Sequence, residues 1–217
     1  MFFYALTPDI FNNGLNIYLN KTTSNPEGVA EPIHLYDALQ TAVDDFGIQI
    51  KTYFESWEHQ AGFPYVTIKR NYNNNQVVFT QQRFLSEGHD NTSLWHIPIS
   101  YSTSTEDLKI VNNFWFSERE SQFIIEGLRP SHILIANLNQ HGYYRVLYDG
   151  PNWRLIAKYL YNGNFSSVSP NTRAMLIDDA AEFAENDMLD IKLFLEMIKH
   201  LEKDVSGIIK YLKYLLV

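Results

Sequence analysis

Near the start of the chain, apolar residues recur every three to four positions, as they do on one face of an α-helix. The first such stripe begins after Thr7 and Pro8, a pair typical of a helix N-terminus because proline fits the first helical turn. Two more stripes follow over residues 32–46 and 48–58. The pattern over residues 1–62 therefore predicts three helices.

Between residues 63 and 150 the pattern changes to short runs rich in β-branched and aromatic residues. The runs over 64–69 and 76–84 flank an asparagine turn at 73–75 and predict a hairpin. Pro98 lies inside a later run and indicates an edge strand or a bulge. No helical stretch alternates with the strands, so we expect an antiparallel β-sandwich without a parallel sheet. About seven strands are predicted, the last five over residues 95–101, 112–116, 122–125, 132–136 and 143–147.

Helical spacing returns over residues 151–217, where Pro151 and Pro170 mark the starts of two helices. Two more are predicted over 189–201 and 208–216. The last of these ends without a polar cap, so we expect the helical domain to continue beyond it. The fold class predicted is thus α+β and multidomain. A helical segment leads into the sandwich, and the sandwich leads into the start of an α-helical, solenoid-like domain.

Composition narrows the possible functions. With 45% hydrophobic and 19% charged residues, the 217-residue chain is that of a globular protein. Its net charge of −8 argues against a nucleic-acid partner, because phosphate binding needs a basic surface. Cysteine is absent from the sequence, which excludes disulfides, thiol nucleophiles and thiolate metal ligands. The apolar runs are shorter than the ~18 residues of a membrane span, so no membrane anchor is expected in these residues. The apolar start lacks the basic stretch of a signal peptide, so no targeting signal is expected there.

The search for catalytic motifs assigns no catalytic or metal-binding residue. The sequence contains no H-E-x-x-H zinc motif, no G-x-S-x-G elbow and no phosphate-binding P-loop. A metal site assembled from separate segments is left as the open alternative for the histidines, at positions 34, 59, 89, 96, 132, 141 and 200.

Two local patterns have both a structural and a functional interpretation. Asp178 and Asp179 point about 100° apart on a helix. This favours a structural pair, one member bonded to a neighbouring loop and the other solvated, over a catalytic dyad. The run over 142–145 is aromatic and basic like a nucleic-acid stacking patch, but the acidity of the chain favours a structural motif at a sheet edge. Three N-x-[ST] sequons are possible glycosylation sites, at Asn20, Asn91 and Asn164. Chance alone would give roughly two, so they are weak evidence for secretion.

Five phrases, in order along the chain, resemble those of zinc aminopeptidases of the aminopeptidase N type. Residues 57–68 are similar to W-x-x-Q-x-G-[FY]-P-[VL]-[VI]-x-[VI], and residues 81–84 to Q-x-R-F. Residues 94–99 resemble [LW]-W-x-[IV]-P-[IL], 142–149 resemble G-[FY]-Y-R-V-N-Y-D, and 173–180 resemble R-A-x-[LI]-[IL]-[DN]-D-A. The residues carrying these matches are Trp57, Gln60, Gly62, Pro64, Arg83, Trp95, Pro98, Gly142, Tyr144, Arg145, Asp149, Arg173, Asp178 and Asp179.

Among these enzymes, the sequence most resembles animal, and in particular insect, aminopeptidase N. The chain departs from the pattern at Leu147, where the family has asparagine, which puts the polar contact of that asparagine in doubt. The resemblance implies three domains: the C-terminal helices of a peptidase-like catalytic domain over 1–62, a β-sandwich domain over 63–150, and the first helices of a C-terminal helical domain over 151–217.

The resemblance also implies where the chemistry lies. The family holds zinc with H-E-x-x-H and a later glutamate, so zinc would belong to the parent and this chain would have no cofactor and no activity alone. The implied partners are the missing catalytic and C-terminal domains and the peptide substrate of the parent, at the cell surface or outside the cell. The alternative hypothesis is a truncated paralogue that acts as a protein-interaction or binding module.

Overall fold

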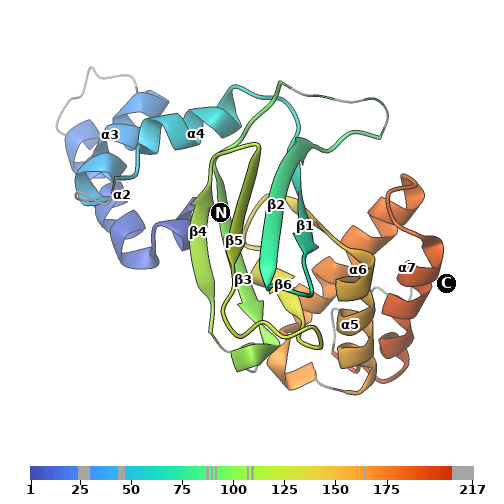
Figure 1. The fold of residues 1–217 in the computed structure, drawn as a ribbon. Coiled ribbons are helices and arrows are strands. Elements are labelled where there is room, and N and C mark those ends of the chain that lie inside the picture. Colours follow the sequence, from blue (N-terminus) through green and yellow to red (C-terminus); the bar gives the residue numbers. More distant parts are fainter. Residues whose placement is uncertain are drawn as a thin grey trace.

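The computed structural model describes residues 1–23, 30–43, 47–86, 88, 90, 92–106, 108, 110–163 and 165–206. A β-sandwich lies between two groups of helices, one formed by the start of the chain and one by its later part (Figure 1). The predicted α+β class, with helices before and after a sandwich, is confirmed. The helix predicted over 208–216 and the end of the stripe over 32–46 lie outside the described residues.

The first group contains the three predicted helices. They are α2 (Pro8–Thr23), α3 (Pro32–Val43) and α4 (Ile50–Glu58). A short turn of helix that the pattern did not predict, α1 (Phe2–Ala5), precedes them. The helices bury a small core of their own, formed by Leu6, Tyr36, Leu39, Val43 and Ile50.

Among the described residues, seven strands form the two sheets of the sandwich, as predicted. The hairpin of β1 (Pro64–Arg70) and β2 (Gln76–Arg83) is confirmed, with Tyr65 opposite Gln82. The first sheet has the order β5-β2-β1-β7 and the second β4-β3-β6. The remaining strands are β3 (Ile97–Thr103), β4 (Asn112–Phe116), β5 (Glu120–Ile124), β6 (Leu134–Ala136) and β7 (Arg145–Tyr148).

The expectation of purely antiparallel pairing is wrong at one edge of the first sheet. There β7 lies parallel to β1, with Tyr65 opposite Arg145 and Ile68 opposite Tyr148. Parallel neighbours need a long crossover, commonly a helix. Here the connection from β1 to β7 runs through the second sheet. Its strand β6 is followed by the short helical turn η2 (Leu138–Gln140) and then by β7.

Pro98 lies on β3, which is the middle strand of its sheet rather than the predicted edge strand. It stands opposite Trp115 of β4, whereas β6 pairs only with residues 101–103. Because β6 is short, the part of β3 that carries the proline has a strand partner on one side only. A residue without an N–H is tolerated at such a position.

The second group of helices begins with α5 (Gly150–Tyr161), α6 (Pro170–Glu185) and α7 (Ile191–Ile198). The side chains of Asp149, Ser169 and Asp190 cap their N-termini, which explains why these helices begin where they do. Proline follows the cap in α5 and α6, as predicted. No helix in the described part of the chain is long and apolar enough to cross a membrane.

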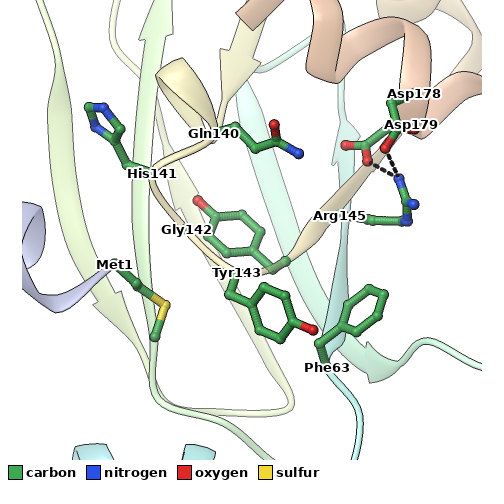
Figure 2. A pocket seen from close by; sticks show the side chains of 10 residues that line it. Met1, Phe63, Gln140, His141, Gly142, Tyr143, Arg145, Asp178 and Asp179 are labelled. Carbon is green, nitrogen blue, oxygen red and sulfur yellow. Dashed lines mark hydrogen bonds and ion pairs between the residues drawn. The ribbon is translucent and has the colours of Figure 1, made fainter. Parts of the chain in front are cut away.

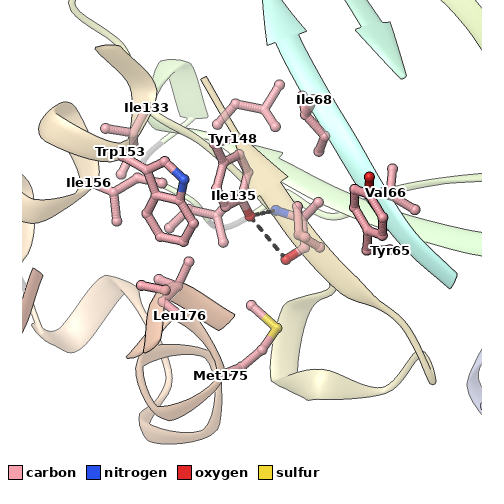
Figure 3. Packing of buried hydrophobic residues seen from close by; sticks show 14 of the residues in the cluster. Tyr65, Val66, Ile68, Ile133, Ile135, Tyr148, Trp153, Ile156, Met175 and Leu176 are labelled. Carbon is pink, nitrogen blue, oxygen red and sulfur yellow. Dashed lines mark hydrogen bonds between the residues drawn. The ribbon is translucent and has the colours of Figure 1, made fainter. Parts of the chain in front are cut away.

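The sandwich and the second group of helices share one continuous core (Figure 3). Trp153 of α5 is fully buried and meets the ring of Tyr148 edge-on, with ring centroids 4.9 Å apart. Met175 and Leu176 of α6 bring the next helix into the same cluster. This packing fixes the helices relative to the sheet edge at β7, where the site described next is found.

Candidate functional site

A cleft of about 380 Å³ lies where the N-terminal helices, the sandwich and α6 meet (Figure 2). Phe63 enters it from the segment before β1, Tyr143 from the loop before β7, and Asp178 from α6. The ring of Tyr143 is 62% exposed and lies 5.2 Å from that of Phe63, centroid to centroid. The other residues that line the cleft are Met1, Gln140, His141, Gly142, Tyr144, Arg145 and Asp179.

The loop between β6 and β7 forms one wall of this cleft, and a buried asparagine organises it. The side chain of Asn137 accepts a hydrogen bond from the Gly142 N–H at 2.8 Å and donates one to the Tyr144 carbonyl at 2.8 Å. Asn139 and Gln140 follow with φ of +59° and +58°, a left-handed conformation that is uncommon for residues other than glycine. The loop is therefore held in a costly backbone conformation by its buried hydrogen bonds.

The side chain of Arg145, on β7, extends to α6 and forms ion pairs with three carboxylates there. Its Nη1 lies 2.6 Å from Asp178 Oδ2 and 2.9 Å from Asp179 Oδ1, and its Nη2 lies 3.5 Å from Glu182 Oε1. The second oxygen of Asp179 accepts the Val146 N–H at 2.9 Å. Since β7 is the end strand of its sheet, this carboxylate satisfies a backbone donor that has no strand partner.

The two adjacent aspartates have different environments. Asp179 is 2% exposed, whereas the side chain of Asp178 is 50% exposed. Burial raises the pKa of Asp179 to about 7, although the hydrogen bonds from Val146 and Arg145 act in the opposite direction. The arrangement can therefore hold a proton near neutrality, but it brings no nucleophile and base together.

Three residues that carry the family resemblance, Trp57, Gln60 and Gly62, precede the sandwich and lie outside the cleft. The first two fasten the end of α4 to the segment just before β3. Trp57 donates its indole N–H to the His96 carbonyl at 2.9 Å. Gln60 donates to the Leu94 carbonyl at 2.8 Å and accepts the Leu94 N–H at 2.9 Å. Gly62 has φ of +84°, a conformation that glycine adopts readily.

Matched residues in the hairpin and the following strand also make structural contacts. Pro64 begins β1 opposite Arg83, which ends β2. Arg83 forms an ion pair with Asp90, Nη1 to Oδ2, at 3.4 Å. Trp95 is fully buried, and its backbone N–H donates to the side chain of Gln81 at 2.9 Å.

Asp149 and Arg173 hold the second group of helices. Asp149 accepts the Asn152 N–H as the cap of α5, and also the N–H of Arg70 at 2.8 Å. Arg173 of α6 forms a buried bidentate pair with Asp204, at 2.6 Å from Nε and 3.0 Å from Nη2. Both residues therefore tie segments together and neither faces the cleft.

Gln81 and Asn137 are fully buried; Gln81 begins the matched phrase over 81–84, whereas no motif singled out Asn137. Gln81 donates to the carbonyls of Trp95 and Glu118, both at 2.9 Å. For Asn137 the only local signal was a polar residue directly after an apolar run. The partners of Gln81 come from distant segments, so its contacts could not be predicted from the phrase alone. Leu147, where the resemblance expects asparagine, packs half-buried against the core.

The described residues do not fit a zinc site. Within the described ranges, no three histidine, aspartate or glutamate side chains are gathered as metal ligands. His96 contacts Ser117 through Nδ1 at 2.6 Å, and His141 stacks on the ring of Tyr4. His200 is buried, with Nδ1 2.6 Å from the Met197 carbonyl. His89 is outside the described residues.

Of the three sequons, only that of Asn20 can be placed. Its side chain is exposed on α2. Asn91 and Asn164 are outside the described residues. Glycosylation at these positions stays a prediction from the sequence.

Comparison with known proteins identifies related sequences. Residues 133–215 match the family described as "ERAP1-like C-terminal domain". An "Aminopeptidase N" of Plutella xylostella is 32% identical over 213 residues, which cover 93% of this chain and 22% of that protein. The human "Thyrotropin-releasing hormone-degrading ectoenzyme" is 31% identical over 208 residues, and the "Membrane alanyl aminopeptidase" of Manduca sexta is 28% identical over 210. The chain spans about a fifth of the length of these relatives.

Proposed function

The chain belongs to the aminopeptidase N-type family, and on that premise we propose that it is a non-catalytic segment of a zinc metallopeptidase. The observation that carries the proposal is the pattern of coverage. Relatives match about nine-tenths of this chain, yet the chain spans only about a fifth of their length. The reaction of such an enzyme, removal of N-terminal residues from peptides, would be carried out by its other domains.

The proposed role of the segment is to hold other parts of the parent in a fixed relation. Trp57 and Gln60 fasten the N-terminal helices to the sandwich. Arg145 and Asp179 fasten the sandwich to α6, and the shared core around Trp153 supports that contact. Three groups of elements are thus joined by short, partly buried contacts, as expected of a scaffold between a catalytic and a helical domain.

In such an enzyme, zinc would supply Lewis-acid chemistry and lower the pKa of a bound water molecule. The residues described here are not arranged to hold the ion, so the proposal assigns zinc to the parent. The peptide substrate and the missing domains are assigned to the parent as partners in the same way. Its place at the cell surface or outside the cell is part of the proposal, supported by the relatives named membrane aminopeptidases.

The first test measures the purified chain for bound zinc and for hydrolysis of a leucyl chromogenic peptide. We expect less than one-tenth equivalent of zinc and no turnover above buffer. Stoichiometric zinc together with turnover would refute the proposal.

The second test uses the full-length parent. Trp57→Ala combined with Gln60→Ala is expected to lower peptide turnover severalfold while the zinc content stays at one equivalent. Glu126→Ala, an exposed position away from these contacts, is the matched control and should behave like wild type. Unchanged turnover in the double variant would contradict a scaffold role for this contact.

A further inference from the structure

The contact between β7 and α6 is unbalanced in charge. Arg145 supplies one positive group, and three carboxylates of α6 meet it, those of Asp178, Asp179 and Glu182. Two of them share a single guanidinium nitrogen, at 2.6 and 2.9 Å. Carboxylates crowded in this way repel one another, so a cluster with an excess of them binds a proton more readily than separate carboxylates do.

The cluster also stands at a mechanically important place. Asp179 bonds the Val146 N–H at the open edge of the first sheet, so its carboxylate connects the sandwich directly to α6. Two buried phenols, those of Tyr144 and Tyr148, are close enough to interact with it, and burial raises the pKa of both. They therefore stay neutral over the range in which Asp179 titrates, and Asp179 is the buried titrating group of the contact.

We propose that the cluster of Arg145, Asp178, Asp179 and Glu182 is a proton-operated joint, which holds β7 and α6 together most firmly when it carries one extra proton. Loss of that proton leaves a buried carboxylate charge that a shared guanidinium compensates only in part. The joint then opens more often, and the cleft beside it widens. This inference goes beyond the scaffold role and does not depend on it.

A second ion pair on the same helix provides an internal comparison. Arg173 meets the single carboxylate of Asp204 in bidentate geometry, one charge against one. Although burial acts against it, hydrogen bonding from Arg173 lowers the pKa of Asp204. Both pairs are buried at α6, and they differ in the number of carboxylates competing for the arginine. Burial raises the pKa of Asp179 most, and the neighbouring Asp178 adds to it. At Asp204, by contrast, the hydrogen bonds from Arg173 and Ser206 keep the pKa lowered despite burial.

The expected effect follows from linkage between protonation and structure. With the pKa of Asp179 raised from its ordinary value to about 7, the closed state binds a proton that the open state releases. The stabilisation is fully present below pH 4 and is lost as the pH rises through 7. Between pH 6 and pH 8 the equilibrium constant for closing should fall by about tenfold.

Two measurements on the whole chain test the joint. The carboxyl ¹³C shifts of aspartate report which residue titrates, and one signal should have its midpoint near pH 7 and be missing in Asp179→Asn. Hydrogen exchange at the Val146 amide, corrected for its intrinsic pH dependence, should show about tenfold less protection at pH 8 than at pH 6. In Asp179→Asn the protection should not depend on pH over this range.

Further variants keep the test decisive if Asp179→Asn does not fold. Asp178→Asn removes one competitor for Arg145, so the titration midpoint of Asp179 should move to lower pH. Asp204→Asn, at the balanced pair, should leave that midpoint unchanged. The proposal is overturned if every aspartate titrates below pH 5, or if the Val146 amide keeps equal protection at pH 6 and pH 8.

Discussion

Asp149 offers the sharpest test of how the sandwich is joined to the second group of helices. Its Oδ1 accepts the Asn152 N–H at 2.8 Å and the Tyr72 hydroxyl at 2.6 Å, and its Oδ2 accepts the Arg70 N–H at 2.8 Å. One carboxylate thus caps α5 and ties the end of β1 to it. The perturbation we consider is Asp149→Ala, with Asp149→Asn as the matched variant.

The magnitude follows from these three hydrogen bonds. Loss of a helix cap costs about 1 kcal/mol. Each of the two remaining bonds to a charged acceptor adds about 1 kcal/mol, because water reaches the partly exposed site and replaces some of the interaction. Asp149→Ala should therefore lower the free energy of unfolding by about 3 kcal/mol. Asp149→Asn keeps one acceptor oxygen and should lower it by about half as much.

Urea unfolding followed by tryptophan fluorescence measures both values, since Trp153 lies one turn into α5. The two variants should show unchanged m-values and midpoints in the order wild type, asparagine, alanine. A loss of less than about 0.5 kcal/mol for alanine, or a larger loss for asparagine than for alanine, would contradict this expectation. Either result would mean that the three contacts do not act through the carboxylate.

Two further pairs of substitutions have clear expectations. Gly142→Ala would place its methyl group against the buried ring of Tyr144 and should lower the free energy of unfolding by about 1–3 kcal/mol, measured by urea unfolding. Gly150→Ala, where space is available, should stay within about 0.5 kcal/mol of wild type in the same assay. Arg173→Met should lower the free energy of unfolding by about 3–5 kcal/mol, because it removes the arginine that compensates the buried charge of Asp204. Adding Asp204→Leu should restore most of that loss. Equal stability of the single and double variants would contradict this expectation.

The helix starts could be predicted because their signals are local. Pro151 and Pro170 each follow a capping side chain, and every group involved lies within four residues of the helix start. The β1–β2 hairpin is local in the same way, with its turn between the two strands. Such features need no knowledge of the distant chain, so pattern and propensity sufficed.

Long-range arrangements could not be predicted in this way. Nothing in the residues of β7 shows that it pairs with β1 in parallel, because the pairing depends on the path through the other sheet. The helical offset of Asp178 and Asp179 indicated different roles for the two. Their partner Arg145, however, meets them only because the shared core positions α6 against the edge of the first sheet.

The parallel position of β7 has a consequence for folding. β1 and β2 are complete early in the chain, but the strand that closes the edge of β1 follows only after the whole second sheet. A pairing between such distant segments is slow to form, because a long loop must close first. During synthesis, β1 therefore emerges from the ribosome long before its neighbour and presents an unpaired row of backbone groups. Intermediates that end before β7 are the species most prone to aggregate, and a chaperone that covers β1 would act at that stage.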